Sequence, residues 1–546
     1  MRFIIWAGMY HEERRISTAA GAVPRGEIPA SFSENPSHPA RPSAAADFPS
    51  IKDFRDPSLP PAGNRPIMHC GILAVAKFMD VSFSPSVLDR RDPRKVRRDL
   101  LIVFTRYPER GRVKTRMIPS LGADGACRLQ REMTAHILAV ARSLPPGIGV
   151  EVHHEGGDEC RMQGLFGSDF RYCRQAEGDL GLRMLQSFRL AADRGAGRIV
   201  LIGTDCPEIS PPLLQQAFDR LCTHECVLGP AADGGYYLVG LTLPEPALFA
   251  DMVWGNENVL TETLARAQLA GIRVSLLQGL PDIDRPEDLP LWGRALLDRA
   301  PRIAAVIPAL NEEKSIADTL RQISRGRNVE SIVVDGGSTD STVMAAEAQG
   351  ARVLRSRPGR AAQMNIGAGE AAAEILLFLH ADTRLPEGFD RRIRQALTDP
   401  RIAGGAFRLH FEGKGAALRI VEWGANLRSR CLQLPYGDQG LFLWKADFLT
   451  AGGFPEIPIM EDALLVRSLR KQGRVVTLPQ KAVTSARRYR RIGPLSTWLI
   501  NQFVVFCFFR GIDPNELARR YREQEGLARW LPLVWHSLRG GRARRG

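Results

Sequence analysis

The sequence lacks the features of a secreted or membrane-spanning protein. Its nine cysteines are an odd number without a C-x-x-C pair, which argues against a disulfide framework and indicates reduced thiols. The apolar residues at its start run into His11 without a convincing cleavage site, so we expect no signal peptide. The longest apolar run, Leu495 to Phe509, is short for a membrane span and contains polar Asn501 and Gln502. These absences predict a cytoplasmic protein.

The longest apolar run is nevertheless bordered by cations that suit an anionic membrane surface. Two interpretations stay open. The run is either a core or lid helix, or an amphipathic helix that holds the protein peripherally on the inner face of a membrane. The bordering cations are Arg487, Arg488, Arg490, Arg491 and Arg510.

Net charge points to an anionic partner. The chain has 74 Lys and Arg against 60 Asp and Glu, a formal charge of +14. Phosphate-bearing substrates and acidic lipids both suit that balance. Because the basic residues are not interleaved with aromatic ones as in an RNA-binding module, nucleic acid is not an expected partner.

Strands and helices alternate in two consecutive stretches. In the first, a strand at 100–107 and a helix at 123–142 are followed by a helix at Leu180–Asp193 and a strand at Tyr236–Leu241. A second alternation begins near Arg302. Such alternation predicts an α/β protein with two tandem doubly wound, mostly parallel sheets.

Composition divides the chain into four parts. Residues 1–97 are rich in Pro, Ser, Ala and Arg without periodicity, which predicts a largely disordered leader with a basic linker, and translation starting inside it stays open. The expected domains are 98–299 and 300–495, and residues 496–546 form amphipathic helices and a basic tail.

Two buried strands each lead to an aspartate. The apolar runs Ile199–Ile202 and Ile375–Leu379 are followed by Asp205 and Asp382. Open α/β sheets bind ligands where their strands end, so each carboxylate is placed to hold a divalent cation against a diphosphate. Asp382 could instead cap the helix that follows Pro386.

Five segments of the second stretch resemble the family 2 glycosyltransferases with the GT-A fold, and more narrowly the rSAM/selenodomain-associated transferase 2 group. They are VIPALNEE, VVDGGSTDST, FLHADT, GDQG and MEDALL, within residues 302–500. The resemblance implies transfer of a sugar from a nucleotide-sugar to a hydroxyl acceptor with inversion.

The same resemblance implies roles for individual residues. Asp462 is the expected general base, with Glu461 beside it, and Mn²⁺ or Mg²⁺ is the expected cofactor. The metal-binding acidic pair falls on His380 and Asp382, where histidine replaces the first acid, so metal binding through His380 competes with a packing role. Nucleotide-sugar and acceptor binding are expected at Pro308, Glu312, Asp335, Asp438 and Gln439.

The first stretch carries cations and a glycine in the loop that follows its opening strand, where a phosphate would bind. GRVKTRM, GTDCPEI, DGGYYLVGL and DIDRPEDL resemble the rSAM/selenodomain-associated transferase 1 group, a DUF2064-like relative of GT-A nucleotidyltransferases. The resemblance implies metal binding by Asp205 and Asp284. It implies phosphate or nucleotide binding by Arg112, Lys114, Arg116, Asp233, Gly234 and Gly235.

The sequence therefore predicts a bifunctional glycosyltransferase-type enzyme. Within the enzyme class, the first domain is alternatively a nucleotidyltransferase that makes an activated donor. A different class of function is a basic protein that binds membrane or RNA through degenerate enzyme domains, and the missing first acid at His380 favours that alternative.

Overall fold

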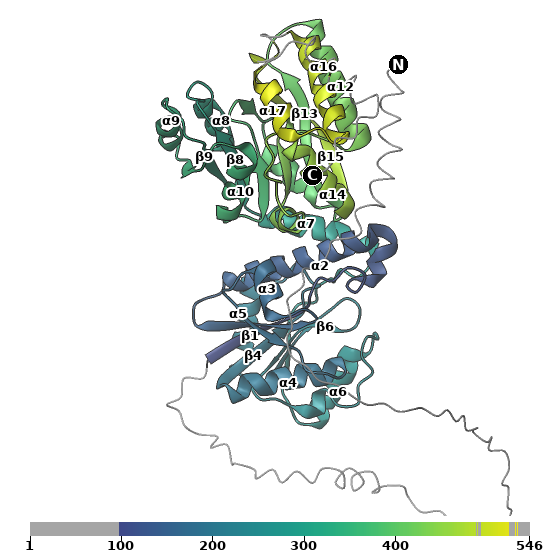
Figure 1. Cartoon of the computed structure of the whole chain (residues 1–546). Helices are drawn as coiled ribbons and strands as arrows, with labels where there is room; N and C mark the ends of the chain where they lie inside the picture. The colour runs from purple at the N-terminus through teal and green to yellow at the C-terminus, as the bar shows by residue number, and fades with distance from the viewer. Residues whose placement is uncertain (1–97, 488, 490–492, 524–529, 531, 533–546) are drawn as a thin grey trace, which may run out of the picture. The chain divides into compact units, whose positions relative to one another are not determined.

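Two α/β sheets with alternating helices make up the computed structural model of the chain (Figure 1), which confirms the predicted fold class. The structure describes residues 98–487, 489, 493–523, 530 and 532. The predicted leader at 1–97 lies outside the described residues, as do Arg488, Arg490 and Arg491. The predicted domain boundaries stay predictions.

The first sheet has the strand order β3-β2-β1-β4-β6-β5-β7. β6 runs antiparallel to β4 and β5, and the other pairs are parallel. Helices α2, α3 and α5 cover one face, and α4 and α6 cover the other (Figure 1). The strands are β1 Arg98–Arg106, β2 Ile148–Glu155, β3 Arg171–Arg174, β4 Ala196–Ile202, β5 Cys226–Pro230, β6 Tyr236–Leu241 and β7 Val274–Leu276. The helices are α2 Ile118–Arg142, α3 Glu159–Phe166, α4 Leu180–Asp193, α5 Pro211–Arg220, α6 Val259–Leu269 and α7 Leu289–Arg299.

The second sheet has the order β10-β9-β8-β11-β14-β13-β15-β12. β14 runs antiparallel to β11 and β13, and β12 antiparallel to β15. Its strands are β8 Ile303–Ala309, β9 Val329–Asp335, β10 Arg352–Arg355, β11 Ile375–Phe378, β12 Thr383–Arg384, β13 Ile402–Phe411, β14 Leu441–Trp444 and β15 Arg474–Thr484. The helices are α8 Ile316–Ile323, α9 Thr342–Ala348, α10 Arg360–Glu370, α11 Phe389–Leu397, α12 Ala416–Leu432, α13 Lys445–Thr450, α14 Glu461–Gln472, α16 Pro494–Phe509 and α17 Pro514–Arg522.

Helices on both faces explain why the central strands are apolar without alternation. One core cluster joins the second sheet to α8, α9 and α11, and another joins it to α10, α13 and α14. β8 pairs in parallel with β9 and β11, so these three strands end at one edge of the sheet. Asp335 is the last residue of β9, and Asp382 lies in the turn between β11 and β12. The sheet thus brings both predicted acids to the edge that binds ligands in open α/β folds.

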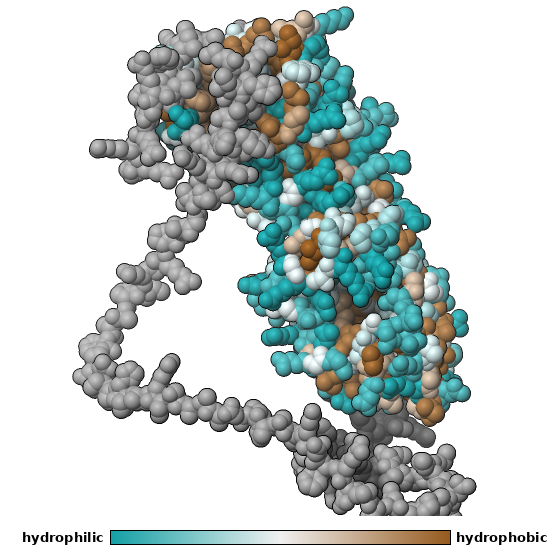
Figure 2. All heavy atoms as spheres, turned by 90° about the vertical axis from the view of Figure 1, so that its right-hand side faces the viewer, coloured by the Kyte–Doolittle hydropathy of each residue, from teal (hydrophilic) through white to brown (hydrophobic). Residues whose placement is uncertain are grey.

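Helix α16 contains the apolar run that the sequence left open between two interpretations. It packs against α12 and α17, and its Ile500, Val504 and Cys507 are buried. No helix among the described residues has the length and apolar character needed to cross a bilayer. Hydrophilic side chains predominate on the described part of the face in Figure 2, with hydrophobic ones scattered between them. Peripheral membrane attachment stays a prediction.

Candidate active sites

The predicted nucleoside side of the C-terminal site is built on the turn after β9. The carboxylate of Asp335 is buried and accepts hydrogen bonds from the backbone N–H groups of Gly337 at 3.0 Å and Ser338 at 3.1 Å. Gly337 has a φ of 99°, which favours glycine. Pro308 lies in β8, paired with Val334 of β9. Asp335 therefore fixes its own turn, and its contact with a nucleoside stays a prediction.

An arginine joins the first loop of the domain to the metal motif. Nη2 of Arg487 donates to Glu312 Oε2 at 2.8 Å and to Asp382 Oδ2 at 3.0 Å. The hydrogen bond to Glu312 is the main cause that raises the pKa of Arg487, and Asp382 adds to it. A guanidinium thus neutralises two of the acids that the sequence assigned to donor and metal binding.

A second cluster surrounds Gly437, at the start of the segment GDQG. Asp462 Oδ2 accepts the backbone N–H of Gly437 at 2.8 Å. A Cβ atom on Gly437 would lie 2.9 Å from Arg360 Nη2, 3.2 Å from His380 Nε2 and 3.5 Å from Asp462 Oδ2. The predicted base and the histidine of the metal motif therefore meet around Gly437, where a side chain would crowd both of them and Arg360, which the sequence analysis missed.

The carboxylates of this second cluster differ in their environment. Burial raises the pKa of Asp438 to about 6, and its buried Oδ1 has no hydrogen-bond partner among the described residues. Burial also raises the pKa of Glu461, against the opposing charge of Arg360, whose Nε lies 3.4 Å from Glu461 Oε1. Asp462 in contrast accepts a backbone N–H on each oxygen, from Gly437 and from Ala463. The site thus holds a well-anchored acid beside one that titrates near neutrality.

The prediction that Gln439 lines the acceptor side needs correction. Gln439 has no exposed surface. Its Oε1 accepts from Ser429 Oγ at 2.8 Å and from Tyr436 N at 3.1 Å, and its Nε2 donates to the carbonyl of Phe407 at 2.9 Å. With its amide fully engaged, Gln439 positions the turn that carries Asp438. The sequence motif marks Gln439 correctly as a special position, but buried polar side chains such as this one form their hydrogen bonds within the protein.

The C-terminal residues fit a divalent cation only in part. Asp382 supplies one hard oxygen ligand, and such ions are often held by one or two carboxylates together with substrate phosphates. His380 is engaged elsewhere, because its Nε2 lies 2.6 Å from Arg360 Nη2. Ligation by His380 stays a prediction that requires Arg360 to move.

The N-terminal domain contains a cavity of about 570 Å³ at the end of its sheet. It brings together residues from loops that are far apart in the sequence. Of the predicted site residues, those that line it are Lys114, Arg116, Asp205, Asp233, Gly235 and Asp284. Further lining residues include Arg106, Arg183, Tyr236, Trp254 and Asp282.

Lys114 is the central cation of the cavity. Its side chain is only 6% exposed, and Nζ lies 3.0 Å from Asp205 Oδ1 and 3.4 Å from Asp284 Oδ1. Burial alone would lower the pKa of Lys114, but the two carboxylates outweigh it and the pKa is raised. Arg116 pairs with the other oxygen of Asp284 at 3.0 Å. Both predicted metal ligands of this domain are therefore held by cations of the predicted phosphate loop.

Asp282 is a further acid at this cavity that sequence reasoning missed. Burial, together with the charges of Asp233, Asp284 and Asp205, raises its pKa to about 6. The signal lay in the segment PDIDRPED, where the acid two residues before Asp284 reaches the same cavity. Converging carboxylate oxygens are the ligand type that Mn²⁺ and Mg²⁺ prefer, so this site fits a divalent cation.

Two of the residues predicted to bind phosphate or nucleotide, Arg112 and Gly234, do not line the cavity. Arg112 is 76% exposed and pairs with Glu109 at 3.2 Å, so its predicted phosphate contact is not part of this cavity. Gly234 has a φ of 88°, and a Cβ there would lie 2.2 Å from the carbonyl oxygen of Glu257. Gly234 thus allows the close approach of two backbone segments beside Asp233.

Comparison with known families agrees with the division of the chain into two α/β parts. Residues 140–256 match the model described as "Uncharacterized protein conserved in bacteria (DUF2064)", and residues 304–441 match "Glycosyl transferase family 2". The two family models match consecutive parts of the chain. This confirms the predicted architecture, in which a DUF2064-like domain precedes a family 2 glycosyltransferase domain.

Individual relatives cover only part of the chain. A glucosyl-3-phosphoglycerate synthase of Mycobacterium tuberculosis is 32% identical over 134 residues, or 22% of this chain, and the chain spans 40% of its length. A mannosyltransferase of Pyrobaculum calidifontis, solved with GDP-Man and Mn²⁺, is 18% identical over 47% of this chain and 88% of its own, with a TM-score of 0.32. The M. tuberculosis synthase solved with Mn²⁺, UDP-glucose and phosphoglyceric acid is 24% identical over 37% of this chain and 78% of its own, with a TM-score of 0.29.

Proposed function

We propose that the C-terminal domain transfers a sugar from a nucleotide-sugar to an acceptor hydroxyl with inversion, and that Asp462 is the general base. A single displacement requires a base within hydrogen-bond reach of the attacking hydroxyl, on the side away from the leaving diphosphate. The anchoring of Asp462 supports this role. Its Oδ2 is held by Gly437 N–H at 2.8 Å, and a carboxylate oxygen that accepts one hydrogen bond keeps a second lone pair.

The donor in this proposal lies along the edge where β8, β9 and β11 end. Asp335 and Glu312 border the nucleoside and Asp382 borders the diphosphate. Two of the compared glycosyltransferases were solved with Mn²⁺ and a nucleotide-sugar, which supports a divalent metal at Asp382. When bound, that ion would neutralise the charge that develops on the leaving diphosphate. Arg487 is already placed there, so it is expected to contact the same phosphates.

The base assignment is tested with Asp462→Asn in the full chain. We expect transfer from a nucleotide-sugar to be lost, because the amide cannot accept the proton of the acceptor, while donor binding by calorimetry stays within about twofold of the wild type. Asp399→Asn is the matched control, since Asp399 pairs with Arg401 outside the site. Transfer by Asp462→Asn at a near wild-type rate would refute the assignment.

For the N-terminal domain we propose binding of a nucleoside triphosphate and a phosphorylated substrate, with nucleotidyl transfer between them. The observation that favours it is one cavity lined by both cations and acids, Lys114 and Arg116 beside Asp205 and Asp284. The test incubates the full chain with nucleoside triphosphates and sugar phosphates and measures pyrophosphate. Release that disappears in Asp205→Asn but persists in Asp462→Asn supports the proposal, whereas sugar transfer lost in Asp205→Asn favours a second glycosyltransferase site.

A further inference from the structure

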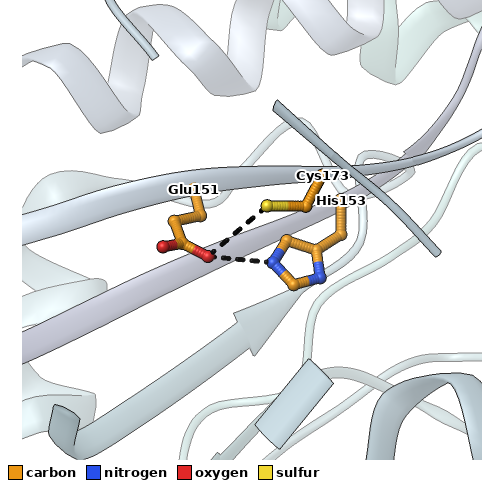
Figure 3. Close-up of side chains that lie close together, drawn as sticks. All are labelled: Glu151, His153 and Cys173. Atoms are coloured by element: carbon orange, nitrogen blue, oxygen red, sulfur yellow. Dashed lines mark hydrogen bonds and ion pairs between the residues drawn. The ribbon is translucent and has the colours of Figure 1, made fainter. Parts of the chain in front are cut away.

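Three side chains outside both candidate active sites converge on the first sheet (Figure 3). Glu151 and His153 lie on the same face of β2, and Cys173 of β3 is paired directly with His153. His153 Nε2 lies 3.2 Å from Glu151 Oε2, and Cys173 Sγ lies 3.8 Å from the same oxygen. All three ligand atoms fall within 4.8 Å of one another, and Glu151 and His153 are buried.

Ser187 holds the ring of His153 in place. Its hydroxyl oxygen lies 2.8 Å from His153 Nδ1 and 3.0 Å from the carbonyl oxygen of Arg183. This contact leaves Nε2 directed at Glu151, with a lone pair for a metal in the tautomer that carries its proton on Nδ1. A hydrogen bond to the other ring nitrogen is also the usual support of a metal-binding histidine.

We propose that Glu151, His153 and Cys173 form a binding site for Zn²⁺, with water as the fourth ligand. Oxygen, nitrogen and sulfur together are a ligand set that Zn²⁺ accepts. In a tetrahedral zinc site, bond lengths of about 2.0 to 2.3 Å separate the ligand atoms by roughly 3.3 to 3.5 Å. The separations of 3.2 and 3.8 Å from Glu151 Oε2 lie close to these values, and no two of the three ligand atoms are more than 4.8 Å apart.

Two arginines compete with a metal for this cluster. Arg194 Nη1 lies 3.1 Å from Glu151 Oε2 and 3.8 Å from Cys173 Sγ, and Arg171 Nε lies 3.9 Å from Glu151 Oε1. Zn²⁺ binds the thiolate, so the Cys173 proton is released on binding. Arg194, with its side chain 33% exposed, can turn toward solvent to open the site.

A metal in this position would be structural. It would tie the edge strand β3 to β2 and, through Ser187, to α4. None of its three ligands lines the 570 Å³ cavity or belongs to the C-terminal site, so this proposal stands or falls independently of both proposed reactions.

The test is titration of the metal-free full chain with Co²⁺ as a spectroscopic substitute for Zn²⁺. We expect one equivalent to bind with visible bands of four-coordinate cobalt and a thiolate-to-cobalt band in the near ultraviolet, and Zn²⁺ to displace it. Cys173→Ser should abolish the thiolate band, and His153→Gln should weaken binding at least a hundredfold. Cys160→Ser is the matched control, because Cys160 is an exposed free thiol in the same domain.

Arg194→Gln provides a variant that keeps all three ligands. We expect it to bind Co²⁺ at least threefold more tightly, since a competing cation is gone. Wild-type protein without a cobalt spectrum overturns the proposal. So does a thiolate band that survives Cys173→Ser or disappears in Cys160→Ser. Circular dichroism of each variant separates loss of a ligand from loss of the fold.

Discussion

Arg360 Nη2 lies 2.6 Å from His380 Nε2 at the edge of the second sheet. Because an arginine only donates, Nε2 must accept, and the imidazole proton resides on Nδ1. Burial and the charge of Arg360 both lower the pKa of His380 well below its ordinary value. A neutral histidine held by an arginine thus occupies the position where the family pattern has an acid.

Replacing His380 with aspartate tests how far histidine at this position lowers the affinity for a divalent metal. We expect His380→Asp to bind Mn²⁺ at least tenfold more tightly than the wild type, because affinity rises with the number of charged oxygen ligands. Binding is measured by the paramagnetic resonance signal of free Mn²⁺. His380→Asn serves as the control that adds no charge. Equal affinities for all three proteins would show that this position does not face the metal.

Asp438 gives a pH dependence that distinguishes it from Asp462. Its pKa of about 6 means that it loses its charge as pH falls through this value. If its carboxylate assists the transfer, kcat/KM decreases below about pH 6 in the wild type, and this decrease is absent from Asp438→Asn. The measurement is a rate profile from pH 5 to 8. A profile that is unchanged in Asp438→Asn would assign the titration to another group.

The sequence was most informative where a pattern is local. Helix α4 and strand β6 have the predicted bounds, since α4 combines an amphipathic repeat with an N-cap in which Asp179 accepts from Leu182 N–H. The acids at positions 335 and 382 also lie at the predicted sheet edge. Such features depend on residues within one turn or strand.

Long-range pairings escaped prediction because nothing local encodes them. Arg360 approaches His380 from the start of another helix, and Arg487 reaches Asp382 across 105 residues. The antiparallel insertion of β14 between β11 and β13 also follows from tertiary packing. Gln439 shows the converse error, in which a motif residue was given a ligand role although its amide is consumed by the fold.

A buried ion-pair cluster predicts the pH range in which acid weakens the fold. Asp447 accepts from Arg128 Nε at 2.8 Å and from Arg131 Nη1 at 2.9 Å, and its side chain is only 3% exposed. Burial would raise the pKa of Asp447, but the two arginines outweigh it and the pKa is lowered. A carboxyl group with a lowered folded pKa stabilises the fold above its unfolded pKa of about 3.9, and that stabilisation is lost as pH falls through the folded value.

Asp447→Asn should therefore lower the free energy of unfolding at pH 7 by about 3 to 5 kcal/mol, because two buried cations lose the carboxylate that they share, and only Arg131 keeps a second one, Glu132. Denaturant unfolding measures the change, which should shrink below pH 4. Asp399→Asn, which removes a more exposed partner of Arg401, should cost no more than about 1 kcal/mol. Equal effects of the two variants would contradict the importance of burial.

Replacing Lys114 should change the affinities for metal and for nucleotide in opposite directions. Its ammonium group lies between Asp205 and Asp284, where a divalent cation would otherwise bind, and it is also the central cation of a cavity proposed to hold phosphates. Lys114→Met should bind Mn²⁺ at least tenfold more tightly in the absence of nucleotide, because Asp205 is released and Asp284 loses one of its two cations. The same variant should bind a nucleoside triphosphate at least tenfold more weakly.

Arg112→Met is the matched control, since Arg112 belongs to the same loop but is exposed and pairs with Glu109. It should change neither affinity by more than about twofold. If Mn²⁺ affinity is unchanged in Lys114→Met, the acids do not form a metal site. If nucleotide affinity is unchanged, the phosphates do not contact Lys114. Because the two measurements fail separately, each identifies which half of the proposed N-terminal site is wrong.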